Sequence, residues 1–84
     1  MKNIIILKHD NIDIISLKKK WPHIRWIHHT NTEECIAFTS LYGHYLHGIF
    51  IDFNTKHLNA TSIYTIIKSE FPNLPILLIP SQHS

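Results

Sequence analysis

The sequence predicts an α/β domain whose strands lie parallel in a single sheet. Two observations carry this prediction: four short apolar runs alternate with three segments of helical periodicity, and the runs are continuously apolar and rich in β-branched residues. Continuous apolar runs are typical of strands covered on both faces, as in parallel sheets. Each intervening helix must return its apolar stripe to the sheet, which implies right-handed crossovers. The expected order of elements is β-α-β-α-β-α-β.

The first half of the chain predicts a strand, a helix and a second strand. Residues 3–8, NIIILK, predict the first strand, because they contain the continuously apolar run Ile4–Leu7 before a lysine. From Asn11 to Trp21 apolar residues recur at helical spacing with lysines on the other face, and Pro22 ends the pattern. Residues 24–28 follow after a very short link and predict the second strand.

A second helix is announced by the residues that precede it. Thr30-Asn31-Thr32-Glu33 fits a capping box, in which a hydroxyl and a glutamate satisfy each other's backbone amides. We therefore expect a helix from about Thr32 to Tyr42, closed by Gly43.

The second half predicts a strand, a helix and a final strand. The expected third strand covers Gly48 to Phe53, and the third helix covers Ala60 to Phe71, where Pro72 ends it. The last strand is expected from Pro75 to Ile79, with Pro80 at its end, where the loss of an N–H donor is tolerable.

Length and composition indicate one small globular domain. A chain of 84 residues buries only about 60% of the surface that its unfolded form exposes, so its reserve of stability is small. The sixteen isoleucines and the 44% apolar fraction exclude a disordered chain. The apolar runs are too short to cross a bilayer, and the opening MKNIIILKHD lacks the apolar core of a secretory signal. We expect a cytoplasmic protein without a membrane partner, and Cys35, the single cysteine, as a small buried thiol.

Charge and histidine content do not predict a nucleic-acid or zinc site. The formal charge is +2, and the run Lys18–Lys20 is interpreted as a solvated helix face. The sequence contains eight histidines. His28 and His29 are adjacent, so in a strand they point to opposite faces, and His44 and His47 have no further zinc ligands nearby in the sequence.

Polar residues follow the expected strands at their carboxyl ends. In open α/β sheets the reactive groups gather beyond these ends, at the crevice where the strand order reverses. The residues that this rule selects are His9 and Asp10 after the first strand, Asp52 and Asn54 after the third, and Ser81 after the fourth.

Together the motifs IIILKHD, IFIDFN, SIYTIIKSEFP and LPILLIPS resemble the receiver domain of bacterial response regulators. The resemblance covers nearly the whole chain and implies a three-layer flavodoxin-like or CheY-like parallel sheet with strand order 2-1-3-4. Residues 1–84 would then be a single truncated receiver-like domain, because a complete receiver continues through a further helix, a fifth strand and a final helix.

The resemblance assigns roles to individual positions. Asp52 matches the aspartate that accepts a phosphoryl group, Asn54 matches the residue whose backbone carbonyl helps to hold Mg²⁺, and Asp10 matches one of the two acids that bind this cation. Oxygen ligands in octahedral array are what Mg²⁺ requires, and no other cofactor is implied. At the position of the second acid the chain has Lys8 or His9, depending on a one-residue shift of the alignment.

Departures from the receiver pattern favour binding over phosphotransfer. Pro80 or Ser81 falls near the switch threonine or serine, and the lysine that ends the fifth strand of a receiver has no counterpart. Each missing group costs several kcal/mol of transition-state stabilisation. The expected function is that of a stand-alone, degenerate receiver-like protein that is not an enzyme and acts by protein–protein association in bacterial signalling or transcriptional regulation. The alternative is an authentic receiver phosphorylated on Asp52 in a two-component phosphorelay.

The last strand predicts where partners bind. In the order 2-1-3-4 it becomes an edge, and an apolar edge exposes unpaired backbone groups together with apolar surface. The predicted interface residues are Pro75, Ile76, Leu77, Leu78 and Ile79. We expect a homodimer, with a full-length response regulator or a histidine kinase as further candidate partners.

Overall fold

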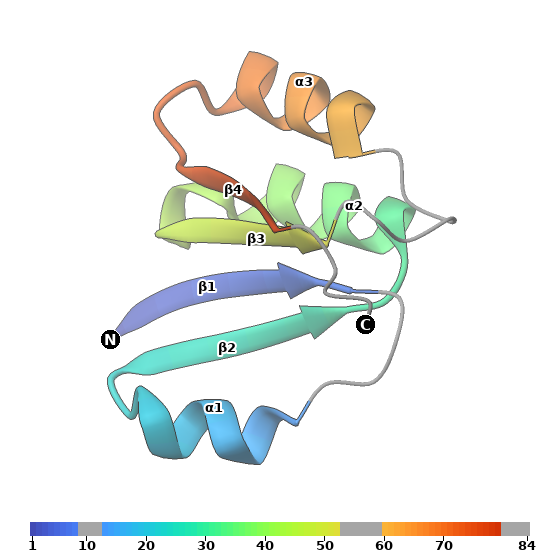
Figure 1. Ribbon diagram of the computed structural model, residues 1–84. Helices are drawn as coiled ribbons and strands as arrows, with labels where there is room; N and C mark the ends of the chain where they lie inside the picture. Colours follow the sequence, from blue (N-terminus) through green and yellow to red (C-terminus); the bar gives the residue numbers. More distant parts are fainter. Residues whose placement is uncertain (9–12, 53–59, 80–84) are drawn as a thin grey trace.

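The computed structural model describes residues 1–8, 13–52 and 60–79, and its elements alternate as predicted. They are β1 (Lys2–Leu7), α1 (Ile14–Lys20), β2 (Ile24–His29), α2 (Thr32–Tyr42), the 3-10 turn η1 (Gly43–Tyr45), β3 (Gly48–Asp52), α3 (Ala60–Glu70) and β4 (Ile76–Ile79). All strand pairs are parallel, and the order in the sheet is β2-β1-β3-β4 (Figure 1). The predicted fold class and strand order are confirmed: the arrangement is that of the first four strands of a flavodoxin-like or CheY-like fold.

The first helix is shorter than the sequence predicts. It begins at Ile14 because Asp13 is its N-cap: one carboxylate oxygen accepts the Ser16 N–H at 3.0 Å, and the other accepts the Ser16 hydroxyl at 2.6 Å. These bonds lower the pKa of the Asp13 carboxyl below its usual value, the hydroxyl bond most of all. Residues 11 and 12, where the predicted helix starts, lie outside the described residues.

The second helix has the predicted bounds but a different cap. Asn31, not Thr30, is the N-cap residue, and its side-chain oxygen accepts the Glu34 N–H at 3.1 Å. The predicted pairing of Thr30 with Glu33 is therefore wrong by one residue. Both Glu33 and Glu34 lie in the first turn, where negative charge is favourable for a helix.

The hydrophobic core lies between the sheet and the pair α2 and α3. The central strands contribute residues with no exposed surface, and the two helices contribute the rest. These core residues are Ile5, Leu7, Ile49 and Ile51 from the sheet and Cys35, Ile63 and Ile67 from the helices. Burial raises the pKa of the Cys35 thiol to about 11, and the neighbouring Thr39 has a smaller, opposing effect.

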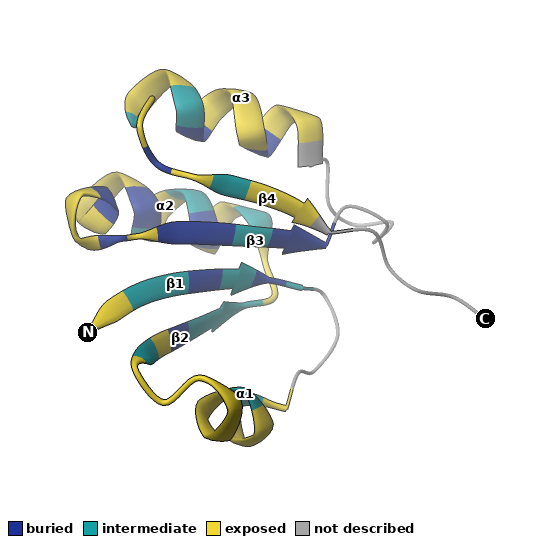
Figure 2. Ribbon diagram, turned by 60° about the vertical axis from the view of Figure 1, so that its left-hand side comes forward, coloured by how far each residue is buried: buried dark blue, intermediate teal, exposed yellow. Residues whose placement is uncertain are grey.

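The other sheet face is only partly covered. Half-buried residues alternate with buried ones in β1 and interrupt the buried run of β3 (Figure 2). Ile4, Ile6 and Phe50 alternate with the fully buried residues of the same strands, so they point to the opposite side, where they are half-buried. Leu77 is the neighbour of Phe50 on β4 and is 54% exposed. We call these four residues the open face.

Among the described residues, one helix packs on the side of the open face, and it lies at the margin of the sheet. Helix α1 packs beside the edge strand β2 (Figure 1). Trp21, which follows this helix, meets Trp26 of β2 with ring centroids 5.9 Å apart, and Trp26 reaches across to Phe50 at 5.7 Å. This aromatic row ends at Phe50, and Leu77 of β4, on the same side of the sheet, is 54% exposed.

Within the described residues, the helices are too short and too polar for any of them to span a bilayer.

Candidate functional site

An ion pair joins the carboxyl ends of the two central strands. Leu7 and Ile51 are neighbours in the sheet, so the residues that follow them, Lys8 and Asp52, are also neighbours. The Lys8 ammonium donates a hydrogen bond to the Asp52 carboxylate at 3.2 Å. The side chain of Asp52 is 10% exposed, whereas that of Lys8 is 32% exposed. The pair therefore has a shielded carboxylate and a more accessible cation.

Backbone contacts from β2 hold Lys8 in this position. The Lys8 N–H donates to the His29 carbonyl at 3.0 Å, and a ring nitrogen of His28, Nε2, lies 3.0 Å from the Lys8 carbonyl. As the donor in this contact, His28 carries its proton on Nε2. These two contacts fix the backbone of Lys8 against β2, while its side chain extends to Asp52 of β3.

This geometry places a fixed positive charge against one carboxylate oxygen of Asp52, Oδ2. An ammonium and Mg²⁺ both neutralise a carboxylate, but the ammonium is covalently part of the chain and is already within hydrogen-bond reach. The sequence alone left Lys8 and His9 as alternatives for the position of the missing acid. Lys8 is the residue that lies against Asp52, and His9 lies outside the described residues.

Most of the other predicted site residues lie outside the described residues. These are Asp10, Asn54, Pro80 and Ser81. The part of the chain that the structure describes contains no group of three or more His, Cys, Asp or Glu residues that could hold a metal ion.

His29, whose carbonyl accepts the Lys8 N–H, turns its ring to the α2 side of the sheet. Its ring packs against Phe38 with centroids 5.2 Å apart, and its buried Nε2 atom has no hydrogen-bond partner. Burial lowers the pKa of His29, since the charged imidazolium is poorly solvated there; Glu34 opposes this shift and His28 adds to it. His29 is therefore a neutral, mainly packing residue near neutral pH.

The side chains of the predicted interface strand point alternately to the two faces of the sheet. Ile76 packs against the core, and Leu78, on the same side, is 37% exposed. Leu77 points to the open face, and Pro75, before the strand, is exposed. Within the described residues β4 pairs only with β3, so it is an edge strand as predicted.

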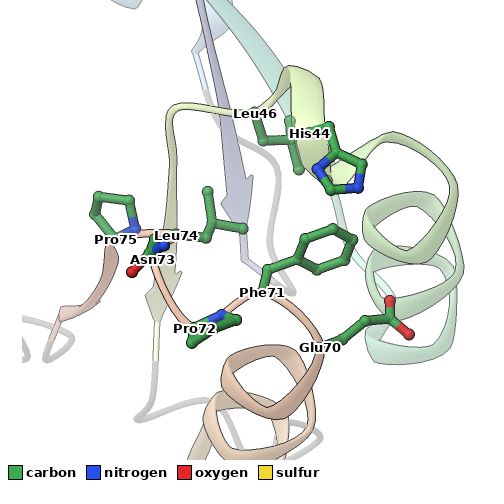
Figure 3. A pocket seen from close by; sticks show the side chains of 9 residues that line it. His44, Leu46, Glu70, Phe71, Pro72, Asn73, Leu74 and Pro75 are labelled. Atoms are coloured by element: carbon green, nitrogen blue, oxygen red, sulfur yellow. The ribbon is translucent and has the colours of Figure 1, made fainter.

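A pocket of about 270 Å³ lies at the opposite end of the sheet, between η1 and the turn from α3 to β4 (Figure 3). Phe71 extends beneath His44, with ring centroids 5.2 Å apart. The Lys68 ammonium donates to the carbonyls of Pro72 and Leu74, at 3.4 and 2.7 Å, so these acceptors of the turn are already bonded. The remaining walls are mainly apolar, and nothing in them selects a ligand class.

Two features of the molecule escaped the sequence-based prediction. The first is the Lys8–Asp52 pair, whose only signal is that each residue stands one position after the paired residues Leu7 and Ile51, a register that the sequence does not give. The second is a recess beside β2 that contains Arg25, which carries no motif at all.

Comparison of the chain with protein-family models, with curated proteins and with solved structures found no match.

Proposed function

We propose that this chain is a degenerate receiver-like protein that acts by protein–protein association, and that its first partner is a second copy of itself. The observation that carries the proposal is the contrast between the two faces of the sheet. In β1 and β3, the isoleucines of the core and Leu7 have no exposed surface, whereas Ile4, Ile6 and Phe50 of the open face are half-buried. Apolar surface that a small domain leaves uncovered is a typical interaction site.

Self-association is favoured because the open face is both apolar and continuous with the edge strand β4. A two-fold related copy would place Leu77 and Phe50 of one chain against the same residues of the other, which is how an isologous interface forms. Burying the exposed half of Leu77 in each copy contributes about 1 kcal/mol per side chain. A full-length response regulator or a histidine kinase would use the same surface as a further partner.

The Lys8–Asp52 ion pair supports the degenerate character of the site. A phosphoacceptor needs its carboxylate oxygen free to attack and a divalent cation beside it. Here the ammonium of Lys8 bonds one carboxylate oxygen of Asp52 directly. We therefore propose binding, not phosphotransfer, as the activity of this chain.

Sedimentation velocity over a range of micromolar concentrations tests the association. We expect a reversible dimer for the natural sequence and a monomer for Leu77→Asp, because the substitution buries a charge at the interface. Ile15→Asp is the matched control: Ile15 is 69% exposed and lies in the first turn of α1, where an acid is tolerated. A folded monomer at all concentrations, or equal dimerisation of Leu77→Asp and the natural chain, would contradict the proposal.

Addition of beryllofluoride and Mg²⁺ tests whether Asp52 is a phosphoacceptor. This phosphoryl analogue binds phosphoacceptor carboxylates, so an authentic receiver would give amide chemical-shift changes that disappear in Asp52→Asn. We expect no such Asp52-dependent changes. Their appearance would establish the alternative, a receiver phosphorylated on Asp52.

A further inference from the structure

The edge strand β2, on the far side of the sheet from β4, offers backbone hydrogen-bonding groups. The carbonyls of His23 and His29 accept from the N–H groups of Lys2 and Lys8, at 3.3 and 3.0 Å. Alternate residues of a strand bond to the same neighbour, so the odd-numbered residues of β2 bond to β1. The backbone N–H and C=O groups of Trp26 and His28 therefore point away from the sheet.

A recess of about 260 Å³ runs beside this edge, between β2 and α2. It is mainly apolar and aromatic, with one charged group. The lining residues, which we call the β2 groove, are Asn3, Arg25, Ile27, Phe38, Tyr42, Tyr45 and Leu46. Phe38 and Tyr42 pack with ring centroids 4.8 Å apart and form one wall, and Tyr42 and Tyr45 are 47% and 67% exposed.

The β2 groove carries a positive charge. Arg25 is exposed and is the single ionised side chain among the groove residues. Glu33 and Glu34 of α2 lie in its first turn, at the other end of the helix from Tyr42.

We propose that the β2 groove binds an extended acidic segment of a partner protein as an additional strand, with a large apolar side chain between Ile27 and Tyr42 and a carboxylate on Arg25. Strand addition to an edge draws its affinity from main-chain hydrogen bonds, and its specificity from pockets that take alternate side chains. Both parts are present at β2: the outward backbone groups of Trp26 and His28, and a groove on one side of the strand.

The spacing of the groove residues specifies the order of side chains in the partner. Arg25 and Ile27 are two positions apart, so both side chains point to the α2 side of the sheet. An added strand has the same repeat, so its apolar residue and its acid should also be two positions apart. An arginine guanidinium binds a carboxylate through two parallel hydrogen bonds, which fixes this register.

A second copy of the chain is disfavoured as the occupant. Two β2 strands related by a two-fold axis would bring the Arg25 guanidinium groups of the two copies to the same edge. Like charges across an interface oppose association. The surface and the partner therefore differ from those of the proposed dimer.

The probe is a fluorescein-labelled threonine-rich peptide with the central order Asp-Thr-Phe-Thr-Asp. Its control has the order Thr-Asp-Phe-Asp-Thr, which has the same composition but puts the acids and the phenylalanine on opposite faces of a strand. A second control replaces both aspartates with lysine. Fluorescence anisotropy should show that the probe binds at least about tenfold more tightly than either control, the discrimination that one Arg–carboxylate pair provides.

Two variants locate the site. Arg25→Glu should weaken binding of the probe at least about tenfold, whereas Lys19→Glu, the same charge change on the exposed face of α1, should leave it within about twofold. In ¹H–¹⁵N spectra the probe should shift the amides of Trp26 and His28 and slow their exchange with solvent. Leu77→Asp should bind the probe normally, because β4 lies at the other edge of the sheet.

The proposal is overturned if the probe and its register control bind equally, if neither binds, or if Arg25→Glu and Lys19→Glu have equal effects. Shifts confined to β4 would also overturn it. None of these results depends on whether the chain dimerises through the open face, so failure here and failure of the proposed function are distinguishable.

Discussion

Replacing Lys8 with methionine removes the cation of the central ion pair while keeping a side chain of similar length. Asp52 then keeps its 10% exposed side chain but loses the ammonium at 3.2 Å. Exposed ion pairs contribute up to about 1 kcal/mol, and removing one partner of a fully buried pair costs about 3 to 5 kcal/mol. With one partner shielded and the other about one third exposed, we expect the free energy of unfolding to fall by about 2 kcal/mol.

Urea unfolding followed by tryptophan fluorescence measures this cost. For a domain of this size the urea dependence is about 1 kcal/mol per molar, so the midpoint should fall by about 2 M. All variants must be compared at one protein concentration, because dimerisation would add to the apparent stability. Lys19→Met, an exposed lysine on α1, is the control and should change the free energy of unfolding by less than about 0.5 kcal/mol.

A double-mutant cycle with Asp52→Asn decides whether the loss comes from the pair. In the Asp52→Asn background position 52 carries no charge for the Lys8 ammonium to neutralise, so Lys8→Met should cost little. We expect a coupling energy of at least about 1 kcal/mol. If Lys8→Met costs the same in both backgrounds, the ion pair does not stabilise the fold and the interpretation of Lys8 as an internal counter-ion is wrong.

Three further predictions follow from packing and burial. A Cβ at Gly43 would overlap the ring of Phe71, so Gly43→Ala should destabilise the fold by about 1 to 3 kcal/mol, measured by urea unfolding, and Phe71→Leu should recover part of this loss. Because burial lowers the pKa of His29, the fold binds fewer protons there than the unfolded chain; stability should be complete above about pH 6.5 and should fall as the pH drops through the lowered pKa. His29→Gln should remove that part of the pH dependence and the exposed His23→Gln should not; equal profiles would refute the assignment. With a pKa of about 11, Cys35 should react with a thiol reagent only as the chain unfolds, so rapid modification of the native protein would contradict its burial.

The class and order of elements could be predicted because the strands are continuously apolar. Runs such as Ile4–Leu7 and Ile76–Ile79 have no helical periodicity, and the prolines at 22 and 72 end the intervening helices. The cap of α2 was misplaced because Thr30, Asn31 and Thr32 are all good capping residues. The backbone conformation decides which of them is the N-cap residue, and that residue is Asn31.

Contacts between elements could be predicted less well than the elements themselves. The sequence places Asp52 at the end of a strand, but the register of β1 against β3 decides which neighbour it meets, and a shift of one residue would exchange Lys8 for His9. The same holds for Trp26 and Phe50, which touch across the intervening strand β1. Such contacts depend on sheet twist and on how far large side chains reach, and neither is encoded in a local pattern.

The strand order has a consequence for how strongly the chain could hold a partner. Since β2 and β4 lie at opposite edges, two copies joined through the open face would carry their β2 grooves at separate, outward positions. A target with two acidic segments could then occupy both at once, and the second contact would form at a high effective concentration. Weak individual contacts would become long-lived only for bivalent targets, which gives a small chain a means of distinguishing assembled partners from single ones.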